Sequence, residues 1–251
     1  MVIGVDRFRD HFAGHETQYV LIGGAACEQI MDEVGLPFRA TKDLDVVLIV
    51  EALDPAFADR FHAFIAAGEY EIRQSSEGER CLYRFAKPKV EGYPAQIELF
   101  ARKPDGLILA EDTGLTPLPF EEEVSSLSAI LLNEDYYAFL TSMVRQIGGL
   151  PILDEAGLIP FKVRAWLDLT ERRNAGQRVD AGDVAKHRRD VARLLQVLPQ
   201  NASFDLPESI RDDMERFVSA LVEDETFAPR QFGVPINRAD VIARLQSAYG
   251  L

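Results

Sequence analysis

Two aspartates have the spacing of a divalent-cation site. Asp43 and Asp45 open an apolar run, LDVVLIV at 44–50, that predicts a buried strand. Because residues i and i+2 of a strand point to the same side, both carboxylates lie together while Leu44 faces the core. Carboxylates this close repel unless a cation lies between them, and Mg²⁺ or Mn²⁺ accepts such hard oxygen ligands. The alternative is a solvated strand edge or a pair of turn-capping aspartates.

A third acid, Glu98, lies in the middle of another predicted strand, Gln96-Ile97-Glu98-Leu99-Phe100. A lone acid in a strand is usually an exposed residue. If this strand pairs with the one that begins at Asp43, Glu98 completes a two-metal site or acts as a general base.

A Gly-Gly turn precedes these acids in the chain. The apolar run 19–22 predicts a strand, and Gly23 and Gly24 separate it from a helix predicted over 25–34. Glycines at such a turn let a phosphate approach the backbone at the positive end of the helix dipole. The turn has neither the G-x-G-x-x-G of a dinucleotide-binding fold nor the G-K-[ST] of a Walker loop. A purely structural turn is the alternative.

The elements that must position these residues indicate an α+β fold. In the first half, helices are expected over 6–15, 25–34 and 55–67, and strands over 19–22, 44–50, 70–73, 81–86 and 95–100. In the second half, helices are expected over 134–147, 161–173, 183–198, 209–222 and 238–249. We therefore expect a mixed sheet with flanking helices in a domain over 1–120, and a mainly helical C-terminal domain over 121–251.

The composition narrows the classes of protein. The chain has 251 residues, of which 47% are hydrophobic and 27% charged, as is typical of globular proteins. Its net charge of −14 excludes a protein that coats DNA or an anionic membrane through its overall field. No apolar run has the length of a membrane span, and no secretory signal is visible. We expect a cytoplasmic protein with reduced thiols at Cys27 and Cys81 and no membrane partner.

One segment is basic within this acidic chain. Residues 162–193 contain nine Lys or Arg and five Asp or Glu, and so carry a net charge of +4. One interpretation is a basic wall that faces the carboxylates across a cleft, where triphosphate or RNA would lie. The other is an ordinary helix surface with ion pairs between residues four apart.

Several stretches together resemble the nucleotidyltransferase superfamily. In the first half they are Val20-Leu21-Ile22-Gly23-Gly24-Ala25, Arg39-x-Thr41-x-Asp43-Leu44-Asp45 and Ile97-Glu98-Leu99. The second of these is similar to the AbiEii/AbiGii toxin group, which includes the MenT-like toxins. The stretches 158–166 and 183–191 resemble that group's lysine motif and its later Lys/Asp helix. The resemblance covers residues 18–198 and implies a nucleotidyltransferase-type sheet with a helical domain that closes the NTP cleft.

The resemblance also implies a role for each matched residue in the first half. The nucleotide-binding residues would be Gly23, Gly24, Arg39 and Thr41. The catalytic metal ligands, for Mg²⁺ or Mn²⁺, would be Asp43, Asp45 and Glu98.

In the second half the resemblance implies that Lys162 reaches the triphosphate and that Asp183 is the last catalytic acid. Asp190 competes with Asp183 for that assignment. The residues alone leave plainer interpretations open, because Lys162 can snorkel past Trp166 and Asp183 can cap the helix that follows it.

The implied function is Mg²⁺-dependent transfer of a nucleoside monophosphate from an NTP to an acceptor hydroxyl. By resemblance the acceptor is RNA, expected to be a tRNA, and the protein is the toxin of a toxin–antitoxin system with an antitoxin as partner. Two alternatives stay open. One is transfer to a small molecule or a protein, and the other is a non-catalytic module of the same fold that binds nucleotide or a partner.

Overall fold

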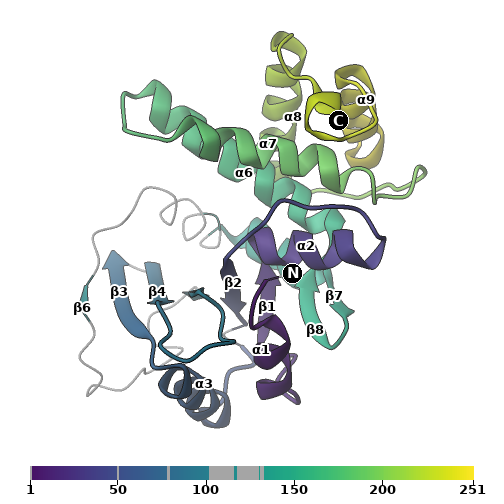
Figure 1. Ribbon diagram of the computed structural model, residues 1–251. Coiled ribbons are helices and arrows are strands. Elements are labelled where there is room, and N and C mark those ends of the chain that lie inside the picture. Colours follow the sequence, from purple (N-terminus) through teal and green to yellow (C-terminus); the bar gives the residue numbers. More distant parts are fainter. Residues whose placement is uncertain (1, 50, 78–79, 102–115, 118–129, 131–132) are drawn as a thin grey trace. The chain divides into compact units, whose positions relative to one another are not determined.

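The chain forms two compact units in the computed structural model (Figure 1). The structure describes residues 2–49, 51–77, 80–101, 116–117, 130 and 133–251, with the backbone alone at 72–77, 80–83, 101 and 116–117. The first unit comprises Met1–Asn133 and Val144–Asp154, and the second comprises Glu134–Met143 and Glu155–Leu251. The sequence predicts one boundary near residue 120, whereas the chain passes between the units three times.

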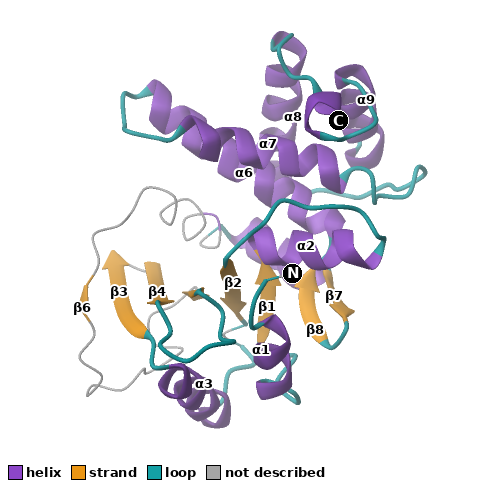
Figure 2. Ribbon diagram, in the orientation of Figure 1, coloured by secondary structure: helices purple, strands orange, loops and turns teal. Residues whose placement is uncertain are grey.

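The first unit is built on an eight-stranded mixed sheet (Figure 2). In spatial order the strands are β6 (Thr116–Pro117), β3 (Glu71–Glu77), β4 (Arg80–Ala86), β5 (Gln96–Ala101), β2 (Asp43–Leu48), β1 (Tyr19–Ile22), β8 (Leu150–Leu153) and β7 (Val144–Ile147). β2 is central, because it pairs antiparallel with β1 on one side and parallel with β5 on the other. The sequence-based expectation of an α+β fold with a mixed sheet, flanking helices and a C-terminal helical part is confirmed.

One face of this sheet carries an aromatic core. Helix α1 (Val5–His11) supplies Phe8, whose ring centroid lies 5.5 Å from that of Tyr19 on β1. Helix α3 (Pro55–Gly68) supplies Phe61, whose ring centroid lies 5.3 Å from that of Phe85 on β4. All four side chains are at most 1% exposed. Stacked and edge-on aromatic contacts of this kind, together with the buried area, hold α1 and α3 against the sheet.

The opposite face of the sheet carries the predicted site residues. Opposite partners in paired strands point to the same face, and neighbours along a strand point to opposite faces. Ile22 and Asp45 are register partners, as are Asp45 and Glu98, so these side chains share the face that Tyr19 does not occupy. Helix α2 (Gly23–Glu33) begins directly after Ile22 and contacts β1 and β2.

The predicted helix over 134–147 is wrong in its second half. Helix α5 (Glu134–Ser142) ends early, and Val144–Ile147 form β7 instead. Gly148 and Gly149 have positive φ values of 56° and 86°, which suit the two central residues of a tight hairpin turn. The turn allows β7 to pair with β8, and β8 pairs with β1 through Leu21 and Ile152. Pairing with distant strands therefore overrides the local helical periodicity.

The second unit is helical. It contains α5 and the helices α6 (Glu155–Asn174), α7 (Ala181–Leu194), α8 (Glu208–Glu223) and α9 (Arg238–Tyr249), with a 3₁₀ turn over Pro229–Phe232. The sequence predicts that the first long helix begins at 161, after Pro160, but α6 begins six residues earlier and includes this proline. Pro160 has no N–H for the carbonyl of Ala156, one turn back. The hydroxyl of Tyr249 donates to that carbonyl at 2.9 Å and replaces the lost donor.

The last fifty residues, for which the sequence gives no motif, complete this helical core. Asp213 of α8 is 7% exposed and accepts hydrogen bonds from the Tyr136 hydroxyl of α5 and the Arg164 guanidinium of α6, both at 3.0 Å. A buried carboxylate requires such partners, since its desolvation is otherwise costly. α8 is thus fixed to α5 and α6 by one shared acid.

We find no helix with the length and apolar character of a membrane span in the described part of the chain.

Candidate functional site

Asp43 and Asp45 stand at the first and third positions of β2. Both are partly exposed, whereas Leu44 between them is fully buried. The alternation predicted from the sequence is therefore confirmed, and the two carboxylates lie on one face of the strand. This face also receives the start of α2, since Asp45 is the register partner of Ile22.

Glu98 lies beside this pair, on β5. The parallel register sets Glu98 opposite Asp45 and Gln96 opposite Asp43. The sequence leaves the pairing of the Glu98 strand with the strand of the two aspartates as a condition, and the structure meets that condition. Three carboxylates therefore occupy neighbouring positions on the same sheet face.

Glu98 has two partners that sequence reasoning missed. Oε1 of Glu98 accepts a hydrogen bond from Nε of Arg84 at 2.9 Å and lies 2.9 Å from Nη2 of the same guanidinium. It also accepts a hydrogen bond from Nε2 of Gln96 at 3.0 Å. Arg84 stands on β4 as the antiparallel register partner of Glu98. The side chains of Arg84 and Glu98 are each 12% exposed, so this ion pair is largely desolvated.

The pKa of Glu98 is raised to about 8. Burial is the largest cause, and the negative charge of Asp45 is the next; Arg84 opposes both and Asp43 adds to the rise. The ion pair alone would favour the charged carboxylate, but burial and the adjacent aspartates outweigh it. Three carboxylates on this face therefore do not all stay ionised near neutral pH without a further cation.

Gly23 is needed for the close approach of Asp45. It has a φ of +67°, and a Cβ built on it would lie 1.7 Å from Oδ2 of Asp45. At Gly24, a Cβ would lie 2.7 Å from Oγ1 of Thr41 and 3.5 Å from Nη2 of Arg39. The sequence predicts that both glycines admit a phosphate. The structure brings all five residues together around the start of α2, and their contact with nucleotide stays a prediction.

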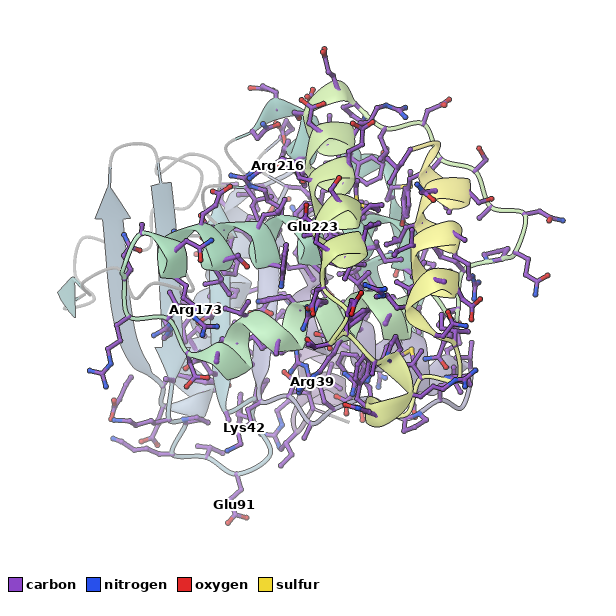
Figure 3. All side chains as sticks on the ribbon, turned by 90° about the horizontal axis from the view of Figure 1, so that it is seen from above. Arg39, Lys42, Glu91, Arg173, Arg216 and Glu223 are labelled. Carbon is purple, nitrogen blue, oxygen red and sulfur yellow. The ribbon has the colours of Figure 1, made fainter. Side chains whose placement is uncertain are left out.

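Two cationic side chains come from the segment between α2 and β2. Figure 3 labels both, Arg39 and Lys42. The guanidinium carbon of Arg39 lies 5.3 Å from the ring centroid of Phe38, which holds the side chain by a cation–π contact. Lys42 is exposed and directly precedes Asp43.

The remaining predicted residues belong to the second unit. Nζ of Lys162 on α6 lies 3.2 Å from Oδ2 of Asp190 on α7, and their side chains are 6% and 0% exposed. Asp183 instead lies 3.0 Å from Nζ of Lys186, one turn further along α7. Of the two acids that compete for the last acidic motif, Asp190 is thus the partner of Lys162. Neither acid caps α7. The N-cap is Asp180, whose side chain accepts a hydrogen bond from the N–H of Gly182.

Most basic side chains of 162–193 are paired within the second unit. The ion pairs are Lys162–Asp190, Arg193–Asp190, Arg164–Asp213, Arg172–Asp168, Lys186–Asp183 and Arg188–Asp224. Arg173, labelled in Figure 3 near the end of α6, is exposed, as is Arg178 in the turn that follows. Among these pairs Arg172–Asp168 joins residues four apart, whereas Lys162–Asp190 and Arg164–Asp213 join different helices. The segment is therefore more than an ordinary helix surface, and the basic wall stays a prediction.

The potential metal ligands are few. Across the described residues, no group of three or more His, Cys, Asp or Glu side chains is arranged to hold a metal ion. Asp43 and Asp45 remain as a pair on one strand face, and metal binding by all three acids stays a prediction. The side chain of Cys27 is buried, that of Cys81 lies outside the described residues, and their reduced state stays a prediction.

Comparison with known proteins gives a distant resemblance. No family model matches the chain, and no curated protein matches it, so membership of the AbiEii/AbiGii group stays a prediction. An antigenic nucleotidyltransferase-like protein from Paracoccidioides brasiliensis is similar in structure, with a TM-score of 0.46 and 13% identity over 99% of this chain and 96% of that one. MenT4, a nucleotidyltransferase toxin from Mycobacterium tuberculosis H37Rv, has a TM-score of 0.30 and 20% identity over 97% and 80% of the two chains. Because both scores are below 0.5, we base the function on the residues of this chain.

Proposed function

We propose that this protein is a metal-dependent nucleotidyltransferase, which moves a nucleoside monophosphate from an NTP to an acceptor hydroxyl. One observation carries the proposal. Asp43 and Asp45 on β2 lie on the same sheet face as Glu98 on β5, where α2 begins with Gly23. Such a face combines ligands for a divalent cation with a helix start that favours a phosphate.

The donor set fits a divalent cation. Two partly exposed carboxylates stand two residues apart, and a Cβ at Gly23 would fill the space that Asp45 occupies. Asp43 and Asp45 would hold Mg²⁺ or Mn²⁺, which commonly takes one or two carboxylates and completes its shell with phosphate oxygens and water. When bound, the metal neutralises charge on the triphosphate and polarises the phosphorus that is attacked.

The chain's own residues would carry out the rest of the reaction. An acceptor hydroxyl oxygen forms a bond to the α-phosphorus, the bond from this phosphorus to the bridging oxygen breaks, and pyrophosphate leaves with that electron pair. Glu98, which Arg84 holds through Oε1, would take the hydroxyl proton as a general base when its carboxylate is ionised. Arg39 and Lys42 lie on the segment that leads into β2 and would attract the phosphates.

For the acceptor, we propose RNA, and specifically a tRNA, on the basis of the sequence resemblance to the toxin group. The same resemblance supports a role as the toxin of a toxin–antitoxin pair, with Lys162 acting on the triphosphate. Transfer to a small molecule or to a protein requires the same chemistry and a different acceptor.

Incubation with α-labelled NTPs tests the proposal. The purified protein, Mg²⁺ and each labelled NTP are incubated separately with total tRNA, with a panel of small hydroxyl compounds and with a protein extract. We expect label in tRNA, and a loss of at least about a hundredfold in Asp43→Asn, which removes a metal ligand. Asp32→Asn is the matched control, because Asp32 is an exposed acid on α2 of the same unit.

The other outcomes separate the alternatives. Label in a small molecule or protein alone would keep the transferase and reject the RNA acceptor. Calorimetric binding of Mg²⁺-NTP with no label in any acceptor would reject the transferase in favour of a nucleotide-binding module.

A further inference from the structure

Arg84 occupies one oxygen of the third acid. Its guanidinium lies 2.9 Å from Oε1 of Glu98 through both Nε and Nη2, and Gln96 donates to the same oxygen at 3.0 Å. Oε2 receives no hydrogen bond from the residues that the structure describes. A rigid guanidinium on a largely buried carboxylate is a strong and directional contact.

The charges of this face balance with a single divalent ion. Asp43, Asp45 and Glu98 contribute three negative charges when ionised, and Arg84 contributes a positive charge that does not titrate. These four side chains therefore carry a net charge of −2 when Glu98 is ionised and −1 when it is protonated, and in either state one divalent cation neutralises them. A second divalent ion would leave this face with a net positive charge before any triphosphate arrives.

We propose that Arg84 is a positioning residue that takes the place of a second metal ion. It holds Glu98 out of the ligand set, so that Asp43 and Asp45 bind one divalent cation in the nucleotide-free protein. Glu98 is then left with Oε2 for proton transfer instead of metal binding.

This inference rests on the proposed cation site at Asp43 and Asp45, and it does not depend on which acceptor the enzyme uses. A double-mutant cycle on Arg84 and Glu98 tests it, with Mn²⁺ as the probe. The nucleotide-free protein is titrated with Mn²⁺, and the free ion is followed by electron paramagnetic resonance. The readouts are the number of ions bound per chain and their dissociation constant.

The expected result is one Mn²⁺ per chain in the wild type. The double variant Arg84→Met with Glu98→Gln removes the ion pair as a neutral unit, and its dissociation constant should stay within about threefold of the wild type. Arg84→Met alone frees the carboxylate, so binding should tighten by about tenfold or more, or a second ion should appear. Lys87→Met is the matched control, since this exposed lysine follows β4 and pairs with Glu71; it should change nothing.

Two results would overturn the inference. One is two Mn²⁺ ions per wild-type chain, and the other is a double variant that loses binding to the same extent as Asp45→Asn. If Asp45→Asn binds Mn²⁺ as the wild type does, the cation site itself is rejected, and with it the proposed function. Because Arg84→Met leaves a buried acid without this partner and so costs folding stability, Arg84→Lys provides a second variant. It keeps the charge and should keep one ion.

Discussion

At the scale of single residues, position 23 requires a glycine. Its backbone is left-handed, with a φ of +67°, and its missing Cβ leaves room for Oδ2 of Asp45. We expect Gly23→Ala to displace this carboxylate and to weaken Mn²⁺ binding by at least about tenfold. Gly14 is the matched control, because its φ is +88° and no atom lies within 4 Å of the Cβ position.

Gly14→Ala should cost only about 1 kcal/mol of stability, from the strained backbone, and leave Mn²⁺ binding unchanged. Thermal unfolding and the Mn²⁺ titration measure the two effects separately. Equal Mn²⁺ affinity in both variants would show that the approach of Asp45 to Gly23 is not needed for the metal.

Glu98 should make the stability of the metal-free protein depend on pH. Its pKa is raised from 4.5 to about 8, chiefly by burial and by Asp45. Between these values the folded protein binds more protons at Glu98 than the unfolded chain does, so the free energy of unfolding falls as pH rises. This contribution is complete below about pH 4.5 and is lost through pH 8, and it amounts to a few kcal/mol at about 1.4 kcal/mol for each pKa unit.

Thermal unfolding in a chelator between pH 5 and 8.5 measures this dependence. Glu98→Gln does not titrate, so its midpoint should fall less steeply than that of the wild type. Added Mg²⁺ should flatten the wild-type curve, since the cation stabilises the ionised carboxylates. Parallel curves for the two proteins would contradict the assignment to Glu98.

The acids of this site could be predicted from the sequence, and their cationic partner could not. Asp43 and Asp45 are visible because strand alternation acts within one stretch of chain. The contact of Arg84 with Glu98 depends on the register between β4 and β5, which is set by the loop and by packing. Arg84 is the single basic residue of the strand predicted over 81–86, but nothing within that stretch shows that it would meet Glu98.

At the scale of elements, local patterns predict the central strands well and fail where distant parts of the chain decide. β1 spans the residues predicted for it, and β2 differs by one or two residues at each end. The helix predicted over 134–147 fails because Gly148 and Gly149 allow a hairpin, a turn signal that the helical periodicity masks. α6 begins before Pro160 because a distant hydroxyl, that of Tyr249, satisfies the freed carbonyl.

Tyr249→Phe tests this replacement of a helix hydrogen bond. The variant keeps the buried ring and leaves the carbonyl of Ala156 without its hydroxyl donor, so we expect a loss of about 1–3 kcal/mol in the free energy of unfolding. Tyr19→Phe is the matched control. Its hydroxyl is also buried, and within the described residues it has no hydrogen-bond partner.

Tyr19→Phe should therefore be neutral or stabilising, because it removes a buried hydroxyl that is not satisfied. Denaturant unfolding of both variants and of the wild type gives the comparison. Equal losses in the two variants would mean that the hydroxyl of Tyr249 does not compensate for Pro160.

At the scale of the whole molecule, the two units are built from interleaved stretches of chain. The hairpin of β7 and β8 belongs to the first unit although it follows α5 of the second. Local composition places a single boundary near residue 120 and cannot reveal this interleaving. The hairpin belongs to the first unit because β8 pairs with β1, which lies far away in the sequence. The first unit contains the carboxylates proposed to bind a cation. The second unit contains the ion pair of Lys162 with Asp190.

This buried pair has either a structural role alone or a structural role together with the proposed contact with triphosphate. Lys162→Met leaves Asp190 buried without this partner and should cost about 3–5 kcal/mol of stability. Adding Asp190→Leu replaces the pair by apolar side chains, which is often neutral, so the double variant should recover most of that loss. Arg193, a further partner of Asp190, is 15% exposed and also reaches the carbonyl of Phe232.

Stability and transfer should then separate in the double variant. We expect a folded protein, with a thermal midpoint near that of the wild type, that transfers label from NTP at least about a hundredfold more slowly because the ammonium group is missing. Its Mn²⁺ affinity should be unchanged, since Asp43 and Asp45 are intact. If the double variant is as active as the wild type, Lys162 has a structural role alone. The cation for the triphosphate is then expected from the first unit, where Arg39 is partly exposed and Lys42 is exposed.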